Sequence, residues 1–398
     1  GTASARSRRA LVAAQLAVAV VLLVGAGLLV RTFTALTRIP LGYSVDGRTL
    51  TFRVNLPSAR YPDTASRATL LSTLVDRVRT LPGVRAVGYT AVAPWNGGMM
   101  SIGFRVEGRP VDPNAVPNVQ FATASDDYFL ASGTPVRTGR AFTPADRPGA
   151  AKVVVISESV ARRFWPNGGA IGSRVRLGSG APGDDSGPFE VAGIVGDTRA
   201  TVMGDIVPTV YMAERLGNPY GGEFVVRSTA DASALIPGIK AILHELDPKL
   251  PLIFPRTMRE VLDATIARQH LAMILMTSFA VLAVVLAALG VYSVMADAVI
   301  GRTREFGIRS ALGAERWSIV ALVLRQGAAT TFAGVGAGLV GATLASRYVA
   351  SLLVGVTPHD APTFILSAAL LVLVAGVACL VPARRATRVE PVEALRVE

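Results

Sequence analysis

The chain has 398 residues, of which 51% are hydrophobic and 17% are charged, and its formal net charge is +12. Soluble domains carry about 25% charged residues, so this composition excludes an ordinary soluble protein and indicates a membrane protein or a hybrid. The single cysteine, Cys379, excludes an intrachain disulfide. The positive charge is almost all arginine and flanks apolar runs, which favours a membrane over nucleic acid as the partner.

The first predicted element is a membrane span. Residues 1–9 carry three arginines and form a cytoplasmic N-terminus, and the uncharged run 10–30 follows. A helix needs about 20 apolar residues to cross a bilayer. The alternative is a cleaved signal peptide, but its apolar core has only about 7–15 residues. The length of the run therefore favours a retained transmembrane helix.

Residues 31–268 have a different character, with many Pro and Gly residues and short alternating runs, and predict a large α+β periplasmic domain. Two stretches, 42–125 and 190–262, each predict a strand, an amphipathic helix and a strand, which together form a split βαβ lobe. The alternative is chance resemblance between two common units. The predicted elements are strand 49–56, helix 64–81 and strand 84–91 in one copy, and strand 223–228, helix 232–246 and strand 250–254 in the other.

The region between the two copies, 126–189, predicts an inserted β-rich subdomain. Its clearest element is the strand KVVVI at 152–156, followed by a short helix over 157–164. Further strands are predicted at 173–177 and 191–195. A Gly/Ser/Asp/Pro stretch separates these last two strands.

Three more transmembrane helices are predicted at 271–296, 317–346 and 361–383, because each range contains an uncharged apolar run long enough to cross a bilayer. The second of these is rich in small residues, which let helices approach closely in lipid. The alternative is a general abundance of Ala and Gly in this chain. The predicted packing face consists of Gly334, Gly338, Gly341, Ala342 and Ala345.

The arginine distribution sets the predicted orientation. Arginines are frequent in 1–9, in the loop 297–316 and in the tail 384–398, but the short loop 347–360 has only Arg347. Cytoplasmic loops carry the excess of positive charge. Both termini and the loop 297–316 are therefore predicted to be cytoplasmic, with the large domain and the loop 347–360 in the periplasm.

A search for reactive motifs favours a protein that is not an enzyme. The sequence has no G-x-x-x-x-G-K-[ST], no H-E-x-x-H and no G-x-S-x-G. Its three histidines are scattered, so no catalytic or metal site is predicted. The adjacent acids Asp126 and Asp127 are interpreted as a solvated turn. A membrane-anchored enzyme stays open as an alternative.

The cytoplasmic loop from Gly301 to Arg316 has more structure than a connection needs. Glu305 precedes Arg309 by four residues, the favourable order for a helical ion pair. Its apolar and glycine positions would give a thin contact surface. The segment is either a helix for a cytoplasmic partner or an interfacial helix on lipid headgroups.

The order of spans, the loop motif EFGIRSALGA at 305–314 and the closing PARRATRVEPVEALR at 382–396 resemble the FtsX-like, MacB-type permeases of ABC transporters. The resemblance implies a coupling helix that docks on a separate nucleotide-binding subunit, which binds the ATP, so no cofactor is expected in this chain. It also implies a bacterial inner-membrane location. The implied coupling residues are Arg304, Glu305, Phe306, Gly307, Ile308, Arg309, Leu312, Gly313 and Ala314.

The resemblance further implies a second permease unit, either as a homodimer or as an upstream half, since the N-terminal segment resembles the second half of duplicated permeases. A periplasmic adaptor is an additional expected partner, alongside the lipid bilayer. The expected function is mechanotransmission in export, or extraction of a substrate at the outer face. The alternative is a membrane scaffold that signals to a periplasmic partner, such as a cell-wall hydrolase, without moving a substrate.

Overall fold

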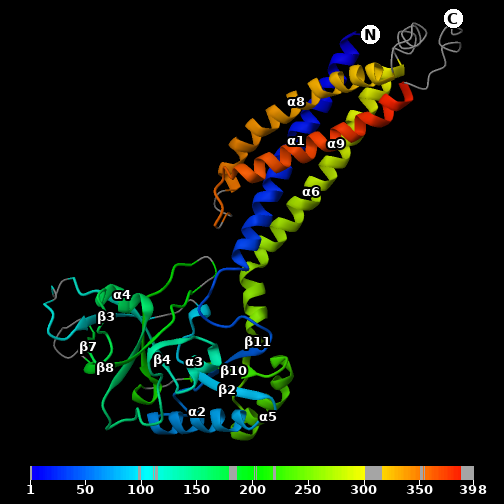
Figure 1. Ribbon diagram of the computed structural model, residues 1–398. Helices are drawn as coiled ribbons and strands as arrows, with labels where there is room; N and C mark the ends of the chain where they lie inside the picture. Colours follow the sequence, from blue (N-terminus) through cyan, green and yellow to red (C-terminus); the bar gives the residue numbers. More distant parts are fainter. Residues whose placement is uncertain are drawn as a thin grey trace, which may run out of the picture. The chain divides into compact units, whose positions relative to one another are not determined.

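The computed structural model describes residues 2–96, 100–110, 112, 115–178, 186–200, 202, 204–217, 221–300, 316–349, 353 and 355–386. The chain divides into two compact units (Figure 1). The helical unit comprises Gly1–Arg38 and Ala267–Glu398, and the sheet unit comprises Ile39–Ile266. The coupling residues Arg304 to Ala314 lie outside the described residues.

In the described residues, the helical unit consists of four long helices: α1 (Thr2–Leu36), α6 (Met258–Ile300), whose first turns belong to the sheet unit, α8 (Arg316–Val349) and α9 (Ala361–Ala386). All four are long and apolar enough to cross a membrane. Leu16, Val20 and Leu371 are buried between them, whereas Leu282 and Leu366 are among many exposed apolar side chains. An apolar surface of this extent requires a lipid or protein cover, which agrees with the predicted α-helical membrane part.

The helix α6 is longer than the uncharged run that predicted it, because its start at Met258 is fixed by a capping box. The Thr257 hydroxyl accepts a hydrogen bond from the Glu260 backbone N–H at 3.2 Å, and Glu260 Oε2 accepts one from the Thr257 N–H at 2.7 Å. These reciprocal bonds satisfy N–H groups that have no partner inside the helix. The charged first turns, Met258 to His270, therefore precede the predicted span at 271.

One mixed sheet of eleven strands forms the sheet unit. Its first group is antiparallel in the order β11-β1-β10-β2. The elements are β1 (Thr49–Asn55), α2 (Thr64–Arg79), β2 (Val84–Thr90), β10 (Gly221–Ser228), η3 (Ala232–Leu235), α5 (Ile236–Leu246) and β11 (Ile253–Thr257). The two predicted strand–helix–strand stretches thus pair in one sheet, and α2 and α5 pack on it together.

Aromatic side chains from three neighbouring strands hold this first group. Phe52 lies opposite Phe224, and Phe224 lies opposite Tyr89, in the strand register. Both pairs of rings stack with centroids 5.0 Å apart. Cross-strand aromatic pairs stabilise a sheet. Here the aromatic rings pack against the apolar face of α2, which includes Leu71 and Leu74.

The second group of strands is drawn from a longer part of the sequence than the predicted insertion at 126–189. The elements are η1 (Pro94–Asn96), β3 (Met100–Val106), β4 (Asn118–Ala124), α3 (Tyr128–Ser132), β5 (Val136–Gly139), β6 (Val153–Ser157), α4 (Glu158–Phe164), β7 (Arg174–Leu177), β8 (Ser186–Val195), β9 (Thr209–Ala213) and η2 (Glu214–Leu216). The strands β3, β4 and β9, which the sequence analysis placed in the βαβ lobe, pair with this group. Non-local pairing, which local periodicity does not reveal, explains the difference.

The two groups join through one strand pair and through a buried cluster that α3 shares with β2 and β10. The strands β2 and β4 share a single pair, Thr90 with Ala124, and the Thr90 hydroxyl donates to the Thr123 carbonyl at 2.5 Å. The backbone of Tyr128 lies against Gly88, where an added Cβ would be 2.4 Å from the Tyr128 Cα. Only a residue without a side chain permits this approach of α3 to β2, so Gly88 helps to fix the contact.

We expect Phe224→Ala to lower the stability of the sheet unit by about 3–5 kcal/mol, because a fully buried aromatic side chain is removed. Phe254→Ala is the matched control, because Phe254 is 71% exposed, and it should change stability by less than about 0.5 kcal/mol. Thermal unfolding of the full chain in detergent, followed by near-ultraviolet circular dichroism, measures both. Equal midpoints for the two variants would contradict the assigned core.

Candidate functional site

The predicted packing face of α8 lies against α1. A Cβ added to Gly334 would be 2.7 Å from the Leu16 Cβ, and one added to Gly338 would be 2.7 Å from the Val20 Cβ. The same added atoms would be 2.8 Å from the carbonyl oxygens of Ala13 and Ala17, respectively. Real Cβ atoms do not approach so closely, so the two helices touch backbone to side chain only because both positions are glycine.

The remaining predicted positions extend this contact. A Cβ on Gly341 would be 3.3 Å from Val21 Cγ2, Ala342 is 2% exposed, and Ala345 is half-buried. The face therefore continues along α8 beside α1, in the manner of small-residue contacts between membrane helices.

Charged contacts occur at the ends of the helices. The Arg8 guanidinium pairs with Asp297 of α6, and the Arg31 guanidinium pairs with Asp360, which precedes α9. Asp360 also accepts hydrogen bonds from the Thr363 hydroxyl at 2.6 Å and the Thr363 N–H at 3.1 Å, and these hold the pKa of its carboxyl below the usual value. Between these ends, the runs 10–30, 271–296, 326–346 and 361–383 contain no Asp, Glu, Lys or Arg.

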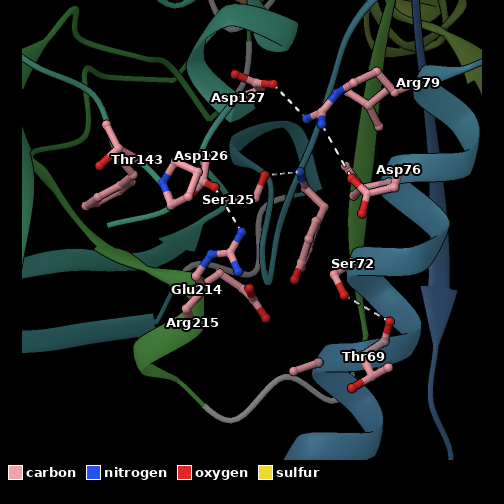
Figure 2. Close-up of a pocket in the computed structure, with 16 residues that line it drawn as sticks. Thr69, Ser72, Asp76, Arg79, Ser125, Asp126, Asp127, Thr143, Glu214 and Arg215 are labelled. Carbon is pink, nitrogen blue, oxygen red and sulfur yellow. Dashed lines mark hydrogen bonds and ion pairs between the residues drawn. The ribbon is translucent and has the colours of Figure 1, made fainter. Parts of the chain in front are cut away.

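A cavity of about 760 Å³ opens beside helix α2 in the sheet unit (Figure 2). We call it the α2 cleft. Side chains of α2 line one side, and residues from the loop before α3 and from η2 line the other. Its lining residues are Ala68, Thr69, Ser72, Val75, Asp76, Arg79, Val87, Tyr89, Ser125, Asp126, Asp127, Phe142, Thr143, Pro144, Glu214 and Arg215.

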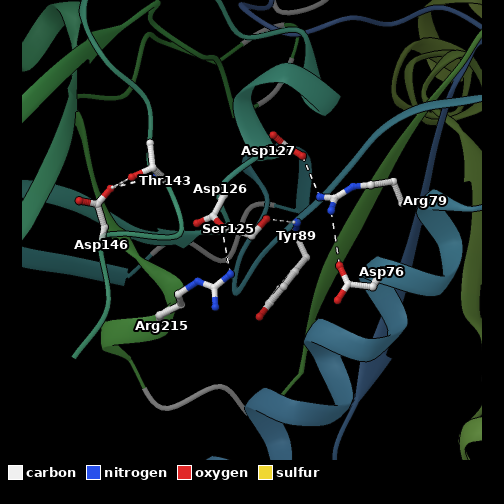
Figure 3. Close-up of polar contacts among 9 residues, drawn as sticks. All are labelled: Asp76, Arg79, Tyr89, Ser125, Asp126, Asp127, Thr143, Asp146 and Arg215. Carbon is white, nitrogen blue, oxygen red and sulfur yellow. Dashed lines mark hydrogen bonds and ion pairs between the residues drawn. The ribbon is translucent and has the colours of Figure 1, made fainter. Parts of the chain in front are cut away.

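Two arginines that line the cleft form ion pairs with three aspartates that also line it (Figure 3). Arg79 of α2 pairs with Asp127 at 2.8 Å and more loosely with Asp76 at 3.4 Å, while Arg215 pairs with Asp126 at 3.0 Å. The interpretation of Asp126 and Asp127 as a simple solvated turn was therefore incomplete. Each acid binds a different arginine, and both arginines are distant in sequence.

Glu214 is a buried acid that lines the cleft. It is 7% exposed, and burial raises the pKa of its carboxyl, while a hydrogen bond from the Tyr89 hydroxyl and the charge of Arg215 act in the opposite direction. The pKa of Tyr89 is also raised by burial and by Glu214. Neither residue is predicted as a site from the sequence, because a glutamate after one strand and a tyrosine within another carry no local signal. Among the described residues, no group of three His, Cys, Asp or Glu side chains is placed to hold a metal.

Two protein-family models match the chain. The MacB-like periplasmic core domain matches residues 10–242, and the FtsX-like permease C-terminal domain matches residues 277–391. The chain belongs to the family of MacB-like, FtsX-like permeases. The predicted resemblance is thus confirmed, and the comparisons place the chain among permeases rather than enzymes.

Two curated relatives illustrate the similarity. The pyoverdine export ATP-binding/permease protein PvdT of Pseudomonas syringae pv. tomato is 28% identical over 81% of this chain and 49% of its own length. The macrolide export ATP-binding/permease protein MacB of Azoarcus sp. is 27% identical over 68% of this chain and 42% of its own length. The chain therefore spans about half the length of the curated relatives that it matches.

Among solved structures, the periplasmic region of MacB from Actinobacillus actinomycetemcomitans is similar over 56% of this chain and 94% of its own, with 17% identity and a TM-score of 0.39.

We expect Gly338→Val to destabilise the helical unit by about 1–3 kcal/mol, the usual cost of overpacking, because its side chain would collide with Ala17 and Val20 of α1. Gly336→Val is the matched control two residues away, since an added Cβ there meets nothing within 4 Å. Thermal unfolding in detergent compares the two variants. If both variants unfold like the wild type, α8 does not pack on α1 through Gly338.

Proposed function

We propose that the chain is the permease subunit of an ABC-type export system and that a separate ATPase subunit powers it. The observation that carries the proposal is the match to the two permease domains, in order, over a chain with four membrane-crossing helices. The named relatives combine ATP-binding and permease parts, and this chain matches about half of their length.

The proposed mechanism is mechanotransmission, in which ATP-driven movement of the partner is passed through the helices to the sheet unit. The uncharged interiors of the four helices support movement rather than ion conduction. Two chain crossings, after Arg38 and after Ile266, join the two units, and the second lies within α6. A second permease unit completes the transporter in this proposal, and a periplasmic adaptor is a further candidate partner.

The proposed orientation places both termini in the cytoplasm and the sheet unit in the periplasm, because arginines concentrate in the segments on the cytoplasmic side. The partner ATPase would then bind the loop 297–316 through the predicted coupling residues. Export as the direction of transport rests on the relatives, whose names describe export.

The orientation predicts a labelling pattern. Ala150→Cys, on an exposed loop of the sheet unit, should react with a membrane-impermeant maleimide in intact spheroplasts, whereas Ser7→Cys should react only after permeabilisation. The background is low, because the single native cysteine, Cys379, is buried. Labelling of Ser7→Cys but not Ala150→Cys in intact spheroplasts would reverse the proposed topology.

The ATPase proposal predicts loss of a partner. The double variant Glu305→Ala/Arg309→Ala should no longer retain a nucleotide-binding subunit in a detergent pull-down analysed by mass spectrometry. The control is Arg259→Ala/Asp263→Ala, which removes an exposed i,i+4 ion pair, of 3.3 Å, from the start of α6. Equal retention of the subunit by both variants would refute coupling through Glu305 and Arg309, and absence of any ATPase from the wild type would favour the scaffold alternative.

A further inference from the structure

The α2 cleft contains a buried carboxyl group without a cationic partner among the described residues. Two other buried carboxylates are fully engaged. Asp146 accepts from two nitrogens of Arg140 at 2.7 and 2.8 Å, and Glu223 accepts from Thr51 at 2.8 Å and Arg53 at 3.1 Å. Glu214 forms no ion pair in the described part of the chain, and its Oε1 atom is buried there without a hydrogen-bond partner.

An acceptor of this kind is costly unless something binds it. Leaving a buried polar atom unpaired costs free energy, so folded proteins satisfy nearly all of them. Burial also raises the pKa of Glu214, because the charged form is disfavoured when solvent is removed. Glu214 lines the α2 cleft (Figure 2), and Oε1 becomes accessible to a donor in the cleft when the side chain turns toward the cavity.

The charges of the lining residues indicate which charge a ligand of the cleft should carry. Four carboxyl groups face two guanidinium groups in the cleft. Both guanidinium groups are already paired, Arg79 with Asp127 and Asp76, and Arg215 with Asp126. The excess negative charge disfavours an anionic ligand and favours a cation that carries N–H donors.

Apolar side chains define the rest of the ligand. Val75, Val87 and Phe142 are buried residues that line the same cleft, and the ring of Tyr89 lies beside Glu214. The volume of about 760 Å³ falls within the range of small-molecule sites. Val75, Val87 and Phe142 are 8%, 1% and 3% exposed, so the apolar part of the lining is small and suits the short hydrocarbon body of an organic cation.

We propose that the α2 cleft binds an organic ammonium ligand with an apolar body. The ammonium group donates a hydrogen bond to Glu214 Oε1, and the apolar body packs against Val87 and Phe142. The site is a property of this chain alone, so it does not depend on an ATPase partner or on transport.

The test uses three probes with one carbon skeleton: 4-phenylbutylamine, 4-phenylbutanol and 4-phenylbutanoate. Calorimetric titration of the full chain in lipid nanodiscs, with empty discs as the blank, gives a Kd for each probe. The amine should bind most tightly and the carboxylate most weakly. Glu214→Gln, which keeps the shape and removes the charge, should weaken the amine about tenfold, equivalent to about 1.4 kcal/mol, and leave the alcohol unchanged. Glu107→Gln, outside the cleft, should change nothing.

A second pair of variants tests the location without altering Glu214. Ser72 and Thr73 are neighbours on α2, but only Ser72 lines the cleft. Ser72→Trp should fill the cleft and abolish binding of the amine, whereas Thr73→Trp should preserve it. The proposal is overturned if the wild type binds no amine, if the alcohol or the carboxylate binds as tightly, or if Ser72→Trp binds normally while the variant unfolds at the wild-type temperature.

Discussion

The close approach of α8 to α1 is the constraint on which the helical unit depends. Lipid supplies no hydrophobic drive for helices to associate, so fit between their surfaces must supply it. Glycine occurs at further contacts as well: Gly27 of α1 meets Thr363 of α9, and Gly327 of α8 meets Cys379 of α9, each at 2.7 Å from an added Cβ. The packing of the helical bundle therefore depends largely on its glycine positions, where no side chain separates two helices.

Charge follows the opposite rule and is absent from the apolar runs 10–30, 271–296, 326–346 and 361–383. A charged side chain at the centre of a bilayer is expensive, and the pairs Arg8–Asp297 and Arg31–Asp360 lie where the apolar runs stop. Both pairs involve α1, one with α6 and one with the residue that precedes α9. These contacts fix which helix ends are neighbours, while the glycine contacts fix how closely the helices approach.

The sequence predicts those elements whose signal is local. The apolar runs predict the four helices, and the stripe containing Leu71 and Leu74 predicts α2, whose bounds differ by only two residues at one end. The start of α6 at Met258 escapes a search for uncharged runs, although Thr257 and Glu260 form a recognisable capping box. The partners of β4 and the contact of Tyr89 with Glu214 join residues far apart in the chain, so no local pattern could have revealed them.

The distribution of charge favours a division of labour between the two units. A cation that crossed between the uncharged interiors of these helices would lose its water without gaining a carboxylate partner, which is costly. The sheet unit, in contrast, offers carboxyl groups at a cavity that is lined by both polar and apolar side chains. Chemistry that distinguishes one ligand from another is therefore expected in the sheet unit, while the helical unit supplies the four membrane-crossing helices. Within that division, Glu214 is the acid to examine first, because Asp76, Asp126 and Asp127 are already engaged by arginines.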